Sequence, residues 1–173
     1  MFCPKGGNKS GVPIIAIAII IMLLVVFMPS FAKIRNLSYR LICSTNMDRL
    51  GKAMMVYATE YNDMYPTSSK WCDLLVEKVK VTPMLFKCKG TSNDGCTHYA
   101  MNKNIEKLGK AASANMVLVF ETGPGWNQCG GQEMLTADNH QGEGCNILFA
   151  DGHVEFVTTQ DLPNLKWATD VNK

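Results

Sequence analysis

The sequence has no strong charge imbalance and no recognisable catalytic signature. Its 17 Lys and Arg residues against 15 Asp and Glu residues leave a net charge of +2, and no basic stripe is interleaved with aromatic residues. A nucleic-acid-binding domain presents such a stripe to the phosphates. The chain also lacks a nucleophile elbow, a glycine-rich phosphate loop and a Cys-x-x-Cys motif. We therefore expect no nucleic-acid partner and no enzymatic activity. The enzyme alternative is a Cys129 or Cys145 thiolate activated by His140.

Charge is missing altogether from one stretch near the N-terminus. Residues 10–32 contain no charged side chain, and residues 14–28 are apolar throughout. A helix needs about 20 such residues to cross a bilayer core of ~30 Å, and this run shows no polar stripe. The sequence predicts a short polar tail over residues 1–11 and a single transmembrane segment over residues 12–32. Ser30-Phe31-Ala32 also suits a signal peptidase, so a secreted protein cleaved after Ala32 is the alternative.

Helical periodicity continues beyond the apolar run. Five residues follow a spacing of three and four and so lie on one helix face: Met47, Leu50, Met54, Tyr57 and Tyr61. Nothing between residues 33 and 61 breaks a helix, and Pro66 stops it. The sequence therefore predicts one helix from Pro13 to Asn62, of which residues 33–62 form the extramembrane continuation.

The remaining residues, 63–173, read as a small α+β domain. Residues 71–76 form a short helix by pattern, residues 82–95 form a loop, and residues 116–120 form a buried strand. Residues 145–150 and 153–157 read as strands joined by Asp151-Gly152, which predicts a type I′ hairpin. Six glycines place residues 122–144 in a loop. The predicted fold is α+β, a long N-terminal helix packed on a small antiparallel sheet.

Six cysteines follow the apolar run, an even number that suits an oxidising compartment. We expect disulfides first between Cys88 and Cys96, next between Cys129 and Cys145, and then between Cys43 and Cys72. Connectivity does not follow from sequence, and reduced cysteines are the alternative. The positive-inside rule instead favours a cytoplasmic C-terminal part, where disulfides would not form. Lys33, Arg35 and Arg40 follow the apolar run, while only Lys5 and Lys9 precede it.

Three groups of residues resemble a known family. Asn139-His140, a ten-residue spacer and Asp151-Gly152-His153-Val154 resemble the C-terminal hallmark of bacterial prepilin-like proteins, in which nine residues separate the histidine from Asp-Gly. Residues 43–53 with Tyr57 and Tyr65-Pro66 match the family's Cys, Asn, Leu-Gly and Tyr-Pro order behind the anchor. Phe86-Lys87-Cys88 and Tyr99-Ala100-Met101-Asn102 form the third match.

The resemblance implies a pilin-like fold and a structural function. The protein would be a pseudopilin-like subunit of a type II secretion or type IV pilus-like system, with a periplasmic or cell-surface C-terminal domain and a cytoplasmic N-terminus. Its partners would be the inner membrane, prepilin peptidase acting at Gly11, and other pseudopilins or copies of itself. Ala16 stands where the family has a glutamate used in assembly. A membrane-tethered binding domain that never polymerises is therefore the alternative.

A metal site is the other chemistry that the sequence suggests. Asp138, His140 and Asp151 surround the predicted hairpin, and Glu121 or Glu143 would add a carboxylate. Such an oxygen-rich set suits calcium, and some pseudopilins bind calcium in a comparable loop. The plainer interpretation is that Asp151 and Gly152 only make the turn and His140 packs the loop.

Overall fold

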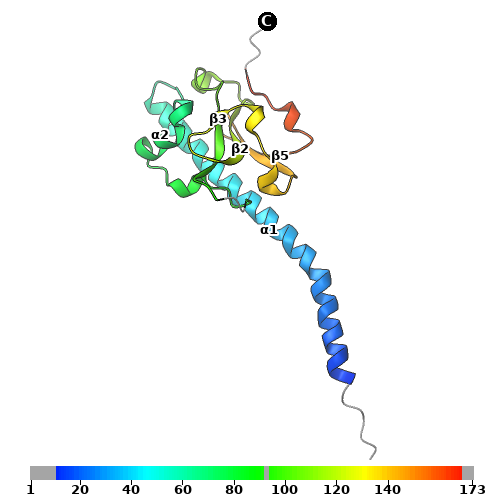
Figure 1. The fold of residues 1–173 in the computed structure, drawn as a ribbon. Coiled ribbons are helices and arrows are strands. Elements are labelled where there is room, and N and C mark those ends of the chain that lie inside the picture. The colour runs from blue at the N-terminus through cyan, green and yellow to red at the C-terminus, as the bar shows by residue number, and fades with distance from the viewer. Residues whose placement is uncertain (1–10, 92–93, 169–173) are drawn as a thin grey trace, which may run out of the picture. The chain divides into compact units, whose positions relative to one another are not determined.

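The computed structural model of the chain describes residues 11–91 and 94–168 (Figure 1). The chain divides into two compact units, Met1–Leu37 and Ser38–Lys173. Helix α1 (Gly11–Glu60) belongs to both units, which confirms one continuous helix, although it begins two residues before the predicted Pro13 and ends two residues before the predicted Asn62. Most of the predicted polar tail, residues 1–10, lies outside the described residues, and the proposed cleavage residue Gly11 begins α1.

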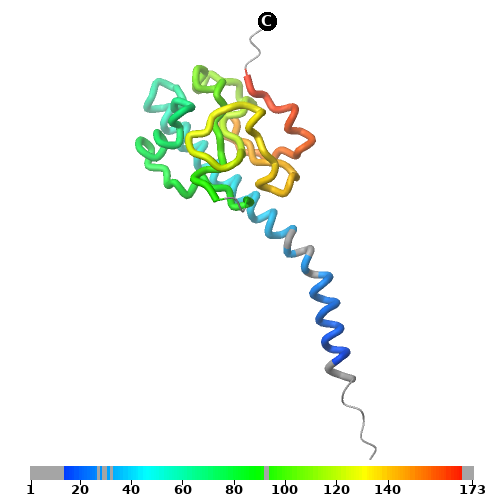
Figure 2. Tube along the Cα trace, in the orientation of Figure 1, coloured from blue at the N-terminus to red at the C-terminus, as the bar shows by residue number. Residues whose placement is uncertain are grey.

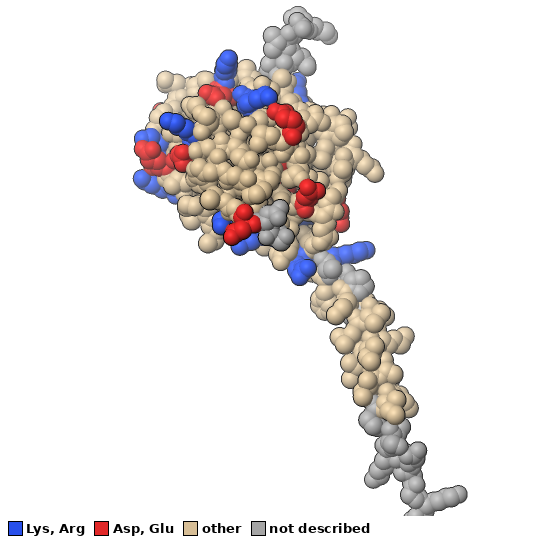
Figure 3. All heavy atoms as spheres, in the orientation of Figure 1, with Lys and Arg blue, Asp and Glu red and all other residues tan. Residues whose placement is uncertain are grey.

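The first unit consists of an apolar helical segment. Twelve large apolar side chains between residues 14 and 28 are each 49–69% exposed, and no charged side chain lies among them (Figure 3). Among residues 11–91 and 94–168, no helix has the length and apolarity that crossing a membrane requires. The membrane-spanning role of residues 12–32 stays a prediction.

The second unit is an α+β domain built on a five-stranded sheet. The strands are β1 (Thr97–Asn102), β2 (Val117–Gly125), β3 (Cys129–Gly130), β4 (Gly144–Phe149) and β5 (Val154–Thr158). Their spatial order is β3-β1-β2-β4-β5, and every pairing is antiparallel except the short parallel contact of β1 with β3. The sheet is therefore mixed, where the sequence predicted an antiparallel one.

Both faces of the sheet are covered by apolar side chains. On one face lie α1 and α2 (Trp71–Lys78), with the core residues Met47, Leu50, Met54, Tyr57, Trp71, Leu75, Tyr99, Met101, Leu118 and Leu148. On the other face, residues 134–137 and the segment after β5 pack against Phe120, Ile147 and Phe149. Figure 2 shows the loop before β4 in front of the sheet and α1 behind it. The predicted helix face is confirmed except at Tyr61, which is partly exposed and stacks on Tyr57.

Two strands and one turn depart from the sequence predictions. β1 was not predicted because polar side chains interrupt it; its buried Asn102 donates to the carbonyls of Val117 and Trp167 instead of facing water. β3 lies inside the region that its glycines assigned to a loop. The hairpin between β4 and β5 is not of type I′, because only Gly152 of the two turn residues has a positive φ, +93°. The hairpin instead has a three-residue loop that ends in Gly152, whose backbone is in the left-handed region.

The side chain of Tyr65 anchors the segment after α1 to the sheet. Tyr65 is 3% exposed, and its hydroxyl donates to the Ala150 carbonyl at 2.9 Å. We expect Tyr65→Phe to lower the free energy of unfolding by about 1 kcal/mol, because it removes one buried hydrogen bond and keeps the ring. Urea unfolding of the full chain measures this loss. Unchanged stability in Tyr65→Phe would show that water replaces the bond without cost.

Candidate metal centre

Four ionisable side chains from four separate segments meet inside the second unit. Cys43 lies on α1, Cys88 follows the 3₁₀ helix η2 (Pro83–Phe86), Glu121 lies on β2, and His140 ends the 3₁₀ helix η5 (Asp138–His140). One ligand atom of each lies within 4.8 Å of those of the others. Cys43 and Glu121 are fully buried, and Cys88 and His140 are each 4% exposed. We name these four residues the Cys₂-His-Glu cluster.

The contacts within the cluster are short and specific. The sulfur atoms of Cys43 and Cys88 are 2.8 Å apart, and His140 Nε2 lies 3.0 Å from Glu121 Oε1. His140 Nε2 also lies 3.7 Å from the Cys88 sulfur. The side-chain amide of Asn146, on β4, donates to Glu121 Oε1 at 2.9 Å and so orients the carboxylate. The Cys88 sulfur lies 3.9 Å from Glu121 Oε1, so that sulfur and the imidazole nitrogen both contact the same carboxylate oxygen.

Backbone amides point at both sulfur atoms. The N–H of Lys89 donates to Cys43 Sγ at 3.2 Å, and the N–H of Gly90 donates to Cys88 Sγ at 3.3 Å. A Cβ at position 90 would lie 2.2 Å from the Asn139 carbonyl oxygen and 2.7 Å from the His140 ring. Only glycine lets this turn approach the imidazole so closely. Amide donors favour sulfur in its anionic form, which is the form that binds metals.

The four groups shift each other's protonation. The hydrogen bond from Cys88 is the main cause that lowers the pKa of Cys43 to about 4, against the opposing effect of burial. The same bond, followed by burial, raises the pKa of Cys88. Burial lowers the pKa of His140, but its bonds to Cys43 and Glu121 outweigh burial and raise that pKa to about 9. Burial raises the pKa of Glu121 despite its bonds to His140 and Asn146.

Two buried oxygen atoms, one in the cluster and one on its neighbour Asn146, lack hydrogen-bond partners among the described residues. Glu121 Oε2 and Asn146 Oδ1 are buried and accept no hydrogen bond from the described residues. An unpaired buried acceptor is costly, by about 1–3 kcal/mol for a neutral group and more for a charged one. These two acceptors are therefore open to a further electropositive partner beside the cluster.

The sequence located only part of this centre. His140 belongs to it, and so does Glu121, one of the two carboxylates expected to complete the metal site. Asp138 and Asp151 do not belong to it, because both are exposed. Asp151 accepts hydrogen bonds from the backbone N–H and the imidazole of His153. Glu143, the alternative carboxylate, forms an ion pair with Arg40 instead. The calcium prediction is not supported, because the cluster offers one carboxylate where calcium takes 6–8 oxygen ligands. The two cysteines were missed as metal ligands because they stand 45 residues apart.

The predicted disulfides are not formed. All six cysteines after residue 40 are free in the structure, and Cys43 contacts Cys88 where Cys72 was expected. Cys88 is a buried member of the cluster, whereas Cys96 is exposed. Cys129 lies on β3 and Cys145 on β4, with β1 and β2 between them. Strands are spaced by about 4.8 Å, so these two Cα atoms lie beyond the ~7 Å that a disulfide spans. His140, in turn, pairs with Cys88 and not with Cys129 or Cys145.

The family hallmark spans the cluster and the hairpin. His140 is part of the cluster, while Asp151 and Gly152 form the turn between β4 and β5. The turn at Gln141 and Gly142, with φ of +60° and +78°, takes up part of the ten-residue spacer. His140 is therefore a buried candidate metal ligand. Asp151 and Gly152 make a turn, as the plainer interpretation of these two residues predicted.

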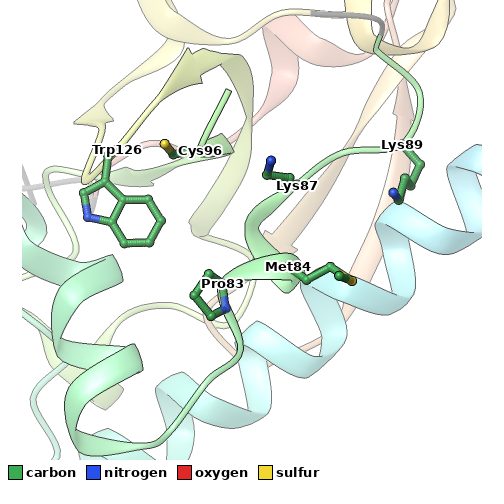
Figure 4. A pocket seen from close by; sticks show the side chains of 6 residues that line it. All are labelled: Pro83, Met84, Lys87, Lys89, Cys96 and Trp126. Carbon is green, nitrogen blue, oxygen red and sulfur yellow. The ribbon is translucent and has the colours of Figure 1, made fainter. Parts of the chain in front are cut away.

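A surface pocket of about 690 Å³ lies beside the loop that carries Cys88. Figure 4 shows its lining, with Trp126 and Cys96 at one side and Pro83 and Met84 at another, while Lys87 and Lys89 come from the loop itself. The two lysines flank Cys88 in the sequence, but Cys88 itself is buried within the cluster. The pocket exposes Cys96 and is separate from the Cys₂-His-Glu cluster.

No family model, curated protein or solved structure matches this chain. The resemblance to prepilin-like proteins therefore rests on the sequence motifs alone.

Proposed function

We propose that the protein is a membrane-anchored, pilin-like structural subunit of a type II secretion or type IV pilus-like system, with its α+β domain outside the cytoplasm. The observation that carries the proposal is the exposed apolar segment of α1. Its large side chains between residues 14 and 28 are each 49–69% exposed. Burying one such side chain contributes about 1.5–3 kcal/mol, so twelve of them favour an apolar environment strongly. Lipid would supply this apolar environment before the filament assembles, and neighbouring subunits would supply it afterwards.

The second unit supports the same proposal. The C-terminal part of α1 packs through one face against a sheet, as a pilin-like subunit requires. The motifs that resemble prepilin-like proteins also lie at structured positions: Cys43, Cys88 and His140 in the cluster, and Asp151-Gly152 in the hairpin. Nearly complete burial of the cluster favours a structural role over catalysis, because a substrate has no direct route to it.

One observation favours a tethered domain that does not polymerise. Ala16 is an exposed residue of α1 at the position where the resemblance expects an assembly glutamate. Alanine carries no charge for the N-terminal amine of a neighbouring subunit. Chemical crosslinking in whole cells separates the two functions, because a filament subunit forms ladders of its own multiples and a tethered domain stays monomeric.

We expect the full chain to stay with the membrane fraction after alkaline carbonate extraction and to dissolve in detergent. The double variant Ile20→Glu/Leu24→Glu should move to the soluble fraction, because a charge near the centre of a bilayer costs about 2.5–3.5 kcal/mol. The control Met84→Glu changes an exposed apolar residue of the second unit and should leave the distribution unchanged. Wild-type protein in the carbonate supernatant would contradict membrane anchoring.

The intact mass of the mature protein tests how the N-terminus is processed. Expression in a host with prepilin peptidase should give a chain that begins after Gly11, the first residue of α1. A chain that begins after Ala32 would establish the secreted alternative. An uncleaved chain that also forms no crosslinked ladder would contradict the filament proposal and leave only the anchor.

A further inference from the structure

We propose that Cys43, Cys88, His140 and Glu121 bind one zinc ion, which joins α1 to the sheet of the α+β domain. The proposal goes beyond the structural function above and does not depend on membrane anchoring. It begins from the convergence of two sulfurs, one imidazole nitrogen and one carboxylate oxygen within 4.8 Å of one another. Four such ligands are the number that a structural zinc site takes.

The spacing of the four atoms is close to that of a tetrahedral site. Zinc lies about 2.3 Å from sulfur and about 2.0–2.2 Å from nitrogen or oxygen, so neighbouring ligand atoms are separated by roughly 3.3–3.8 Å. The Cys88 sulfur lies 3.7 Å from His140 Nε2 and 3.9 Å from Glu121 Oε1. The sulfur pair at 2.8 Å and the His140–Glu121 pair at 3.0 Å would open by less than about 1 Å to admit the ion.

The surroundings of the cluster fit bound zinc better than a disulfide. Both sulfurs accept backbone N–H groups, from Lys89 and Gly90, which stabilise thiolates. Asn146 holds the Glu121 carboxylate in place, as groups around metal ligands commonly do. A Cys43–Cys88 disulfide would use only the two sulfurs, whereas a bound cation would also use the Glu121 carboxylate and the His140 nitrogen that meet them. A cation between the four residues would balance the negative charge of the thiolates and of the Glu121 carboxylate once Cys88 and His140 have lost their protons.

The ligand set selects zinc over calcium. Thiolate and imidazole are soft or borderline ligands that suit zinc, whereas calcium is held by oxygen atoms. Binding requires the Cys88 thiol and the His140 imidazole to give up their protons to solvent, and the metal takes their place. The ion would then link α1, the loop after η2, β2 and η5, four segments that are distant in sequence.

The experiment measures metal in the full chain, purified in detergent under inert gas without added chelator. We expect about one zinc per chain by plasma mass spectrometry, and free thiols at Cys43 and Cys88 only after the metal is removed. Reloading with Co²⁺ should give a thiolate charge-transfer band and the intense visible absorption of tetrahedral cobalt. These measurements need no variant, so they remain decisive even where a substitution prevents folding.

Variants then assign the ligands. Cys43→Ser and Cys88→Ser should each lower zinc affinity by at least about 100-fold, and Glu121→Gln by about 10–100-fold. The matched control Cys96→Ser replaces an exposed cysteine and should keep full zinc content. A Cys43–Cys88 disulfide in the protein as purified, a reduced chain that takes up neither metal, or equal zinc loss in Cys96→Ser would each overturn the proposal.

Discussion

The Trp71→Ala variant is expected to unfold with a free energy about 3–5 kcal/mol below that of the wild-type protein. Trp71 begins α2 and is fully buried. Its indole N–H donates to the Gln128 carbonyl at 3.0 Å, and its ring packs edge-on against Phe86 with centroids 5.4 Å apart. Alanine removes the hydrogen bond and the ring and leaves a cavity between α2 and the sheet. Urea unfolding of the full chain in detergent, followed by far-ultraviolet circular dichroism, measures the loss.

Trp126 provides a matched control of the same residue type. Its ring also lies 5.4 Å from Phe86, but the side chain is 37% exposed and its N–H bonds to the surface residue Asp73. We expect Trp126→Ala to cost about 1 kcal/mol, because water can replace much of what is lost. Equal losses of unfolding free energy for the two variants would show that burial of the Trp71 ring does not determine the stability of this domain.

The Gly90→Ala variant is expected to lose about 1–3 kcal/mol of stability and to disturb the Cys₂-His-Glu cluster. The added methyl group would lie 2.2 Å from the Asn139 carbonyl oxygen, which is backbone and cannot rotate away. It would also lie 2.7 Å from the His140 ring, so relief of the clash must move the imidazole or the turn at Cys88. We therefore expect weaker zinc binding together with the lower midpoint of urea unfolding.

Gly123→Ala is the control for this substitution. Gly123 lies in strand β2, and nothing lies within 4 Å of a Cβ placed at this position. Its stability should stay within about 0.5 kcal/mol of the wild-type value. If Gly90→Ala unfolds at the same urea concentration as Gly123→Ala, the close approach of the turn to His140 is not required.

The elements predicted correctly are those with a strong local pattern. The face of α1 repeats every three to four residues from Met47 to Tyr57, and α2 and the β4–β5 pair also follow their patterns. The missed strand β1 shows the limit of this reasoning. His98 and Asn102 interrupt its apolar character, and only carbonyl acceptors from distant segments make the burial of Asn102 favourable.

The sequence by itself determined the continuous helix and the α+β class, and it named His140 and Glu121 only as candidate ligands of a calcium site. Local periodicity and composition suffice for the helix and the fold class, because backbone hydrogen bonding and side-chain alternation act over a few residues. Only the tertiary structure brought Cys43 to Cys88 and excluded Asp138 and Asp151. Proximity along the chain favoured Cys96 as the partner of Cys88, but packing of α1 against the sheet brings the distant Cys43 closer. Ligand geometry depends on such long-range packing, which no local pattern encodes.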